Sequence, residues 1–318
     1  MNINFNNINN AYYSNQIALN KIYGQNGLLL WEKETIPTPV GSFIVFSSTK
    51  EFYIVVSYSG NHHWNGTIEC SRDGIIWSTW TGYERTSLMD SYGIYRLYFR
   101  GKNNTIIGDL WSIRPTTSNT SIKVSCHGDI RNLLNYTNVN NTTMDEYCFK
   151  QMFEGSPLTT APELPATTLA SYCYYKMFYN CNYLTTAPEL PATTLANHCY
   201  NAMFESCYGL TTAPELPATT LANYCYYEMF AHCTSLTTAP VLPATTLKSG
   251  CYSFMFSNCT ILNYIKAMFT TKPSTTYTEN WLKDVAETGT FVKNSAATWN
   301  VTGISGVPTN WTIQYASS

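Results

Sequence analysis

Alternation of apolar and polar residues marks the segment 41–126 as a β-domain. Phe52, Ile54 and Val56 fall on one face of an extended chain, and such a period of two predicts a half-buried strand. Asp73-Gly74 is a turn signal between two runs of this kind. Short strands joined by turns about every 8–12 residues are typical of an antiparallel β-sandwich, which we expect here. Further strands are predicted at 67–71, 75–79, 94–100 and 122–126.

The same segment contains four tryptophans: Trp64, Trp77, Trp80 and Trp111. A domain of this size depends on its large aromatic side chains for a core, so we expect these rings inside. Some of them could instead form part of a binding face.

A pattern with a fixed, longer period fills residues 147–269. The segment LTTAPELPATTLANYCYYEMFAHC, residues 210–233, occurs four times with small changes, and neighbouring copies are 26 residues apart. A period of about 20–50 residues indicates an array of stacked units. The positions that keep this period include Pro162, Pro188, Pro214 and Pro240, Cys173, Cys199, Cys225 and Cys251, and Cys181, Cys207, Cys233 and Cys259.

Each unit divides into two halves. Cys173, Met177, Phe178 and Cys181 fall within one side of a helical wheel, which predicts a short helix with one apolar face. The half TTAPELPATTLA has to be extended, because its two prolines remove two backbone donors. One unit is too thin to have a core, whereas stacked units bury each other's apolar side. We therefore expect an α+β protein, with a β-sandwich-like domain followed by a leucine-rich-repeat solenoid.

The remaining segments are expected to attach the protein to a partner, to connect the two domains and to cap the repeats. Residues 1–40 contain two short apolar runs around Gly24-Gln-Asn-Gly27, which predicts a β-hairpin. An isolated hairpin is marginally stable, so it needs a neighbouring domain or another protein to pack against. Residues 127–146 are expected to connect and cap the repeats, and residues 270–318 to cover their last unit. The candidate attachment residues are Lys21, Ile22, Tyr23, Leu29 and Trp31.

Composition excludes several classes of partner. Only 12% of residues are charged and the net charge is −2, without a basic patch, so we expect no nucleic acid as partner. No stretch reaches the roughly 18 apolar residues of a membrane span, and no signal peptide is visible at the start. Aromatic residues make up 15%, which suits a recognition surface.

Candidate catalytic and metal-binding residues are few. Glu163, Glu189 and Glu215 share one repeat position that Val241 takes in the fourth unit, and equivalent stacked acids are not the differently tuned pair that glycoside hydrolysis needs. The cysteines lack C-x-x-C spacing, and we expect them to pack as a buried ladder of free thiols. The adjacent His62-His63 would point to opposite faces of a strand. The sequence therefore predicts no enzyme, no metal and no cofactor.

A row of tyrosines on the predicted helices is the candidate ligand-binding surface. Rigid amphipathic rings of this kind suit sugars or proteins. The alternative is that the rings pack between adjacent units. The row consists of Tyr174, Tyr175, Tyr200, Tyr226, Tyr227 and Tyr252.

The repeats resemble a known family. CYYEMFAHCTSLTTAPVLP, residues 225–243, follows the order IGxxAFxxCxxLxxVxLP of the BspA-like, or Treponema-type, leucine-rich repeats, in the variety seen in surface and phage proteins of gut Bacteroidales. Residues 281–313 look like the C-terminal ending of that variety. Residues 67–82 and 98–101 resemble a β-module that often precedes it, and residues 18–33 are similar to an N-terminal element common in phage structural proteins.

The resemblance implies adhesion to host or glycan surfaces. Secreted adhesins carry an export signal and a lipoprotein cysteine, which this N-terminus does not show and which a virion protein does not need. We therefore expect a non-enzymatic virion structural protein, a phage head or tail fibre or other appendage, assembled in the host cytoplasm. Its expected partners are capsid or tail proteins and a host surface glycan or protein, and it is expected to be a homo-oligomer. A bacterial cell-surface adhesin is the alternative, followed by a capsular polysaccharide hydrolase.

Overall fold

The computed structural model describes residues 40–56, 64–108, 110–117 and 121–316, together with four short strands before them. The chain forms two compact units, Met1–Pro39 and Val40–Ser318. In the first unit β1 (Ala11–Tyr12) pairs with β2 (Ala18–Leu19), and β3 (Lys21–Tyr23) pairs with β4 (Leu29–Glu32), both antiparallel. The pairing of Ile22 with Trp31 confirms the predicted hairpin.

Two β-sheets open the second unit. The larger has the order β14-β13-β5-β11-β7-β8, with β10 also paired to β11, and the smaller has the order β12-β6-β9. The bounds are β5 (Ile44–Ser48), β6 (Phe52–Val56), β7 (Thr67–Ser71), β8 (Ser78–Thr79), β9 (Arg85–Thr86), β10 (Leu88–Met89), β11 (Tyr95–Lys102), β12 (Trp111–Pro115), β13 (Val124–His127) and β14 (Leu158–Thr160).

Aromatic rings fill the space between these two sheets. Trp111 of the smaller sheet lies 5.0 Å from Phe99 and 6.5 Å from Phe46 of the larger one, measured between ring centroids. Trp80 lies 4.9 Å from Trp111 and is also buried. The prediction that tryptophans form the core is therefore confirmed for Trp80 and Trp111, whereas Trp64 and Trp77 are only half-buried.

One predicted strand of this domain is mostly absent. Of residues 75–79 only Ser78 and Thr79 are in a strand. The carboxylate of Asp73 accepts hydrogen bonds at 2.8 Å from the amides of both Ile75 and Ile76. These bonds hold the segment in a turn, which leaves the two isoleucine side chains exposed.

The predicted architecture of the repeats is wrong. The expected helix at 173–181 does not form, and the described residues contain only two α-helices, α1 (Asn132–Asn135) and α2 (Thr275–Thr278), of four residues each. A short 3-10 helix, η2 (Val139–Asn141), completes the helical elements. The protein is therefore mainly β rather than α+β, without a leucine-rich-repeat solenoid of helices and extended segments.

A chain of tight turns takes the place of the helix. Tyr172, Lys176 and Asn180 all have positive φ angles of 53–58°, at intervals of four residues. Equivalent residues of the next unit, His198, Ala202 and Ser206, repeat the pattern. In each four-residue step two neighbouring side chains point inward and two outward, as the burial pattern of residues 173–180 shows.

Backbone hydrogen bonds explain why this conformation is stable. The amides of Tyr175 and Met177 donate within the turns, to the carbonyls three residues earlier. The intervening amides donate to the next unit, as that of Lys176 does to the carbonyl of Asn201 at 3.0 Å. A helix would satisfy all these amides inside one unit, whereas the turns direct every second one to a neighbour. The units therefore hold together by backbone pairing as well as by their side chains.

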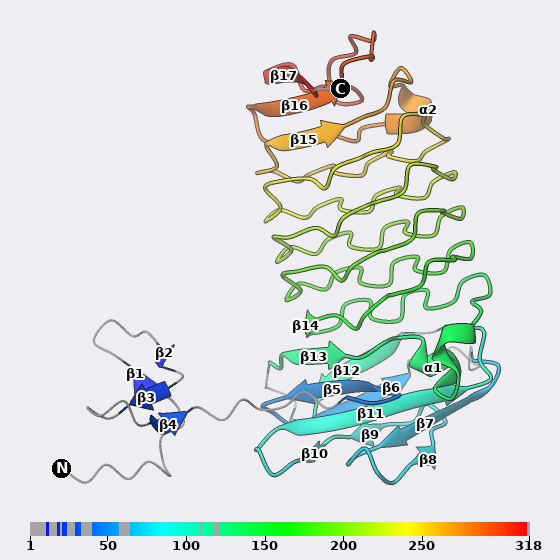
Figure 1. Cartoon of the computed structure of the whole chain (residues 1–318), viewed down its shortest axis with the longest axis vertical. Helices are drawn as coiled ribbons and strands as arrows, with labels where there is room; N and C mark the ends of the chain where they lie inside the picture. The colour runs from blue at the N-terminus through cyan, green and yellow to red at the C-terminus, as the bar shows by residue number, and fades with distance from the viewer. Residues whose placement is uncertain are drawn as a thin grey trace. The chain divides into compact units, whose positions relative to one another are not determined.

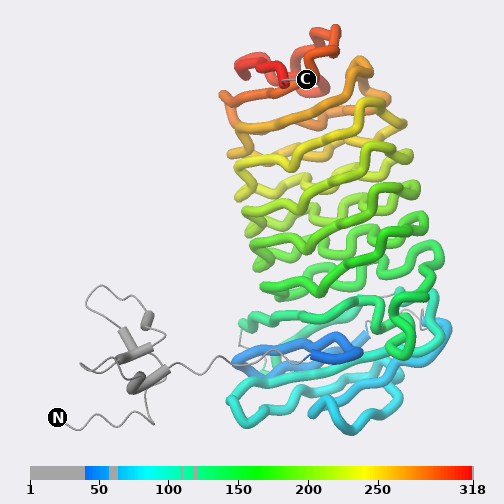
Figure 2. The backbone as a smooth tube through the Cα atoms, in the orientation of Figure 1, coloured from blue at the N-terminus to red at the C-terminus, as the bar shows by residue number. Residues whose placement is uncertain are grey.

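The units lie one above another as layers, as the ribbon and tube views show (Figures 1 and 2). Isolated parallel bridges join equivalent residues, such as Thr186 with Thr212. At one end of the stack β14 pairs with β13 of the larger sheet. At the other end β15 (Tyr264–Ala267), β16 (Gly289–Asn294) and β17 (Trp311–Ala316) form a parallel sheet. The finer domain boundaries at 127, 147 and 270 stay predictions.

The cysteines form part of the continuous core, and all eleven are buried and free. This confirms the predicted ladder of thiols. The second cysteine of each unit also donates a hydrogen bond to a phenylalanine carbonyl of the preceding unit, at 3.0 Å from Cys207 Sγ to Phe178 O. Cys233 bonds to Phe204 in the same way at 3.1 Å. The thiols therefore both fill the core and satisfy carbonyls there.

Candidate functional site

The outward positions of the turn chain carry a set of half-buried and exposed aromatic residues. We call the surface formed by Tyr147, Tyr172, Tyr175, Tyr179, His198, Tyr224 and Tyr227 the aromatic face. These residues are half-buried or exposed, whereas the positions between them point into the core. The four-residue step of the turns places them on one side of the stack.

One column of the aromatic face is a continuous stack of rings. Tyr147 stacks on Tyr172 at 4.8 Å between centroids, Tyr172 on His198 at 4.3 Å, and His198 on Tyr224 at 4.8 Å. The column ends at Gly250, where an added Cβ would lie 2.2 Å from the Tyr224 ring. Since neighbouring rings cover each other's faces, the column presents ring edges and hydroxyl groups to solvent.

A second column is less regular and mixes rings with charge. Tyr175 packs edge-on against Tyr172 at 6.0 Å, and Lys176 Nζ lies 4.6 Å from the centre of the Tyr179 ring. In the next unit Asn201 takes the place of Tyr175, and its side-chain amide lies 3.1 Å from Nδ1 of His198. Because the unit between Tyr175 and Tyr227 carries Asn201 at the equivalent position, no ring lies between these two tyrosines in this column.

Two carboxylates lie beside these rings in an environment that disfavours charge. Burial raises the pKa of Glu205, although Lys176 Nζ at 3.8 Å opposes the shift. Burial, then the charge of Glu205, raises the pKa of Glu228. Burial and the Glu228 carboxylate raise the pKa of Tyr227 to about 12. The face therefore offers neutral hydroxyl donors next to acceptors.

The structure separates the tyrosines predicted to bind a ligand into two groups. Tyr175 and Tyr227 lie on the aromatic face. The other four are buried and stack on each other with centroids 5.8–6.0 Å apart, so as surface contacts they were wrongly assigned. These inner residues are Tyr174, Tyr200, Tyr226 and Tyr252. Their burial corresponds to the other interpretation of the tyrosine row given in the sequence analysis, in which the rings pack between adjacent units.

The stacked column was missed from the sequence. Tyr172, His198 and Tyr224 each directly precede the first cysteine of their unit, a regularity that is visible without a structure. Tyr172 and Tyr175, like Tyr224 and Tyr227, are three residues apart, a spacing that places them side by side on a helix as well, so this signal could have been found from the sequence.

The predicted attachment residues lie in the first unit. Lys21, Ile22 and Tyr23 belong to β3, and Leu29 and Trp31 belong to β4. Their side chains lie outside the described residues, as do His62 and His63.

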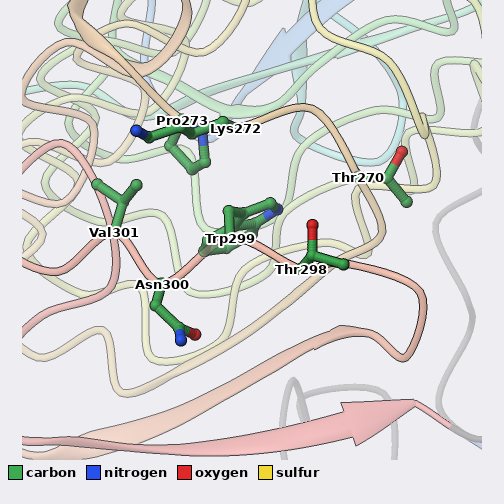
Figure 3. A pocket seen from close by; sticks show the side chains of 7 residues that line it. All are labelled: Thr270, Lys272, Pro273, Thr298, Trp299, Asn300 and Val301. Carbon is green, nitrogen blue, oxygen red and sulfur yellow. The ribbon is translucent and has the colours of Figure 1, made fainter.

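A hollow of about 670 Å³ lies beside the C-terminal strands, with Trp299 at its centre (Figure 3). One face of the Trp299 ring stacks on Phe269 at 5.3 Å, and Lys293 Nζ lies 4.7 Å from the ring centre. The indole nitrogen donates to the carbonyl of Phe269. Because Phe269 and Lys293 pack against the Trp299 ring, the ring is not free to stack on a ligand in the hollow. Its other lining residues are Thr270, Lys272, Pro273, Thr298, Asn300 and Val301.

Two further hollows repeat on the proline-containing half of the units. One, of about 470 Å³, lies between Ala161–Pro165 and the segment 188–191, and the other, of about 430 Å³, between Ala213–Pro217 and the segment 240–243. They are equivalent sites two units apart. Half of the residues that line each hollow are prolines, with Glu163 and Glu189 at the first and Glu215 at the second.

Comparisons with known proteins leave the family open. No family model, no curated protein and no solved structure matches this chain. Within the described residues, no helix is long and apolar enough to cross a membrane. Those residues also contain no group of three or more His, Cys, Asp or Glu side chains arranged to hold a metal ion.

Proposed function

We propose that this protein is a non-enzymatic virion appendage, a phage head or tail fibre, that binds a host surface through the aromatic face of its repeats. In this proposal the N-terminal unit attaches to capsid or tail proteins. The resemblance of the repeats and of residues 18–33 to phage proteins supports the location, and the aromatic face supports the binding role.

The observation that carries the binding role is the exposed column of stacked rings. Tyr147 is 40% exposed and Tyr224 37%, although both rings are immobilised by their neighbours. Tyrosine is favoured at recognition surfaces because it offers a large contact at low entropic cost, and stacking lowers that cost further. The column is therefore a preorganised set of hydroxyl groups.

The chemistry of the face favours a hydroxyl-rich ligand. The tyrosine hydroxyls and the Lys176–Glu205 pair are hydrogen-bonding groups. A polysaccharide presents many hydroxyls at a regular spacing, as the stacked layers do. We infer a host surface glycan as the ligand class.

The buried thiols favour binding over nucleophilic catalysis. A catalytic cysteine needs a lowered pKa, because the thiolate is the nucleophile. Burial here raises the pKa of Cys181 and Cys259 to about 12. These thiols stay neutral and serve packing.

Removal of single hydroxyls tests the binding role without disturbing the stack. The double variant Tyr172→Phe/Tyr224→Phe keeps both rings, and Tyr208→Phe is the matched control, because Tyr208 is exposed but lies outside the aromatic face. Binding of labelled full-length protein to host cells and to their purified capsular polysaccharide is measured by fluorescence. We expect about tenfold weaker binding for the double variant, from roughly 0.5–1.5 kcal/mol per hydrogen bond. Equal binding by all three proteins refutes the role of the face.

Mass spectrometry of purified virus particles tests the location. We expect peptides of this chain at a constant ratio to the major capsid protein through successive density gradients. Loss of the peptides on purification, or their recovery with the bacterial envelope, contradicts the virion proposal and favours the adhesin.

A further inference from the structure

The last strand of the stack leaves core-facing side chains uncovered. In the C-terminal sheet Ile265, Phe291 and Ile313 lie side by side in register, one on each strand. Ile265 and Phe291 are fully buried, whereas Ile313 is 37% exposed. The neighbouring row shows the same change, from buried Ala267 and Lys293 to Tyr315, which is 59% exposed. Among the residues that the structure describes, no further strand covers either row.

The backbone of β17 is open on the same side. β17 pairs with β16 along six residues, and no strand in the described part of the chain pairs with its other edge. Natural open edges are commonly protected by charge, proline or a bulge. The sequence WTIQYA of β17 carries no charge and no proline. The edge of β17 therefore lacks these protective features and is open to pairing with another strand.

A second copy of the chain fits this edge without a further component. Two β17 strands can pair antiparallel about a twofold axis, which makes the contact self-complementary. The edge brings no like charges together. The buried Lys293 lies one strand below β17, so the two copies' lysines would be three strand spacings, roughly 14 Å, apart. That separation exceeds the Debye length of about 8–10 Å at physiological salt.

The burial pattern also determines the register. Residues directly opposite in an antiparallel pair point to the same face, so a core-facing residue has to meet a core-facing residue. With the twofold axis at Gln314, Ile313 lies opposite Tyr315 of the partner subunit, and Tyr315 opposite the partner's Ile313. A shift by one residue would set Ile313 against the partner's Gln314 and expose the apolar row.

We infer that this protein forms a twofold dimer through β17, with Gln314 on the axis and Ile313 packed against the partner's Tyr315. The contact joins the two C-terminal sheets into one sheet of six strands. This assembly goes beyond the proposed function and does not depend on it, because the aromatic face lies along the side of the stack and stays free.

Sedimentation of the full-length protein over a range of concentrations tests the dimer. We expect a reversible monomer–dimer equilibrium, which Ile313→Lys weakens at least tenfold by placing a charge in the pairing edge. Ile75→Lys is the matched control, because Ile75 is an exposed isoleucine between β7 and β8, in the β-domain at the opposite end of the stack from β17. A monomer at every concentration, or a dimer that Ile313→Lys leaves unchanged, overturns the inference.

Crosslinking tests the register and does not depend on the lysine variant. In Gln314→Cys the two new thiols lie directly opposite, with about 4.5–5.5 Å between Cα atoms, a separation that a disulfide spans. In Thr312→Cys they lie four residues out of register, roughly 13 Å apart. The eleven native thiols are buried, so oxidised glutathione acts on the new one. We expect a covalent dimer from Gln314→Cys alone; crosslinking of neither variant, or of Thr312→Cys, contradicts the proposed pairing.

Discussion

A substitution at His232 distinguishes the turn chain from the helix that the sequence indicates. His232 is exposed, has a φ angle of 63°, and its backbone amide donates to the carbonyl of Ser257 in the next unit. His232→Ala and His232→Gly both remove the imidazole and keep the amide. The difference between the two variants therefore reports the backbone conformation alone.

The expected sign follows from the left-handed conformation. An L-residue with a Cβ pays about 1–2 kcal/mol there, which glycine avoids, although glycine loses more chain entropy on folding, about 0.5–1 kcal/mol. We expect His232→Gly to be more stable than His232→Ala by up to about 1 kcal/mol. In a helix interior the order reverses, with alanine favoured by about 1 kcal/mol.

Urea unfolding followed by circular dichroism measures this difference as a shift of the midpoint at constant slope. Thr260 provides the control, because it is also an exposed turn residue but has no positive φ. There we expect Thr260→Ala to be more stable than Thr260→Gly. A His232→Ala variant that is more stable than His232→Gly would refute the turn-chain explanation of the repeats.

Three further predictions concern the interior. The hydroxyl of Tyr174 is buried without a hydrogen-bond partner, so Tyr174→Phe should raise the free energy of unfolding by about 1 kcal/mol in urea titrations; a loss would show that the hydroxyl is satisfied. Burial and Glu205 raise the pKa of Glu228, so the folded state binds this proton more tightly and its contribution to stability falls as pH rises through the raised pKa. Glu228→Gln should therefore be more stable than wild type at pH 7, with the difference shrinking toward pH 4.5; unfolding curves at both pH values test this, and a constant difference contradicts it. All eleven thiols are buried, so intact-mass analysis should find none alkylated by iodoacetamide in the native protein and eleven in urea; rapid native labelling would contradict their burial.

Several features could be predicted from the sequence because they depend on local signals. The strands β6 and β7 were predicted with the bounds that the structure has, since both show clear alternation. The hairpin of β3 and β4 follows from two apolar runs around a Gly/Asn turn. The free thiol ladder follows from the 26-residue period, which requires every position to stack on its own copy.

The sequence by itself determined that the units stack and that their leucine, methionine, phenylalanine and cysteine positions lie inside, because apolar spacing and period are properties of the chain. Only the tertiary structure decided how each unit folds. Cys173, Met177 and Cys181 follow one another at intervals of four residues. Over so short a segment, this spacing is almost equally compatible with a helix of 3.6 residues per turn and with a chain of four-residue turns. The choice between them depends on amides that bond to the next unit, and those partners exist only after stacking. The same four-residue step turned Tyr174 inward and left Tyr175 outside, so the exposed surface was decided between the units.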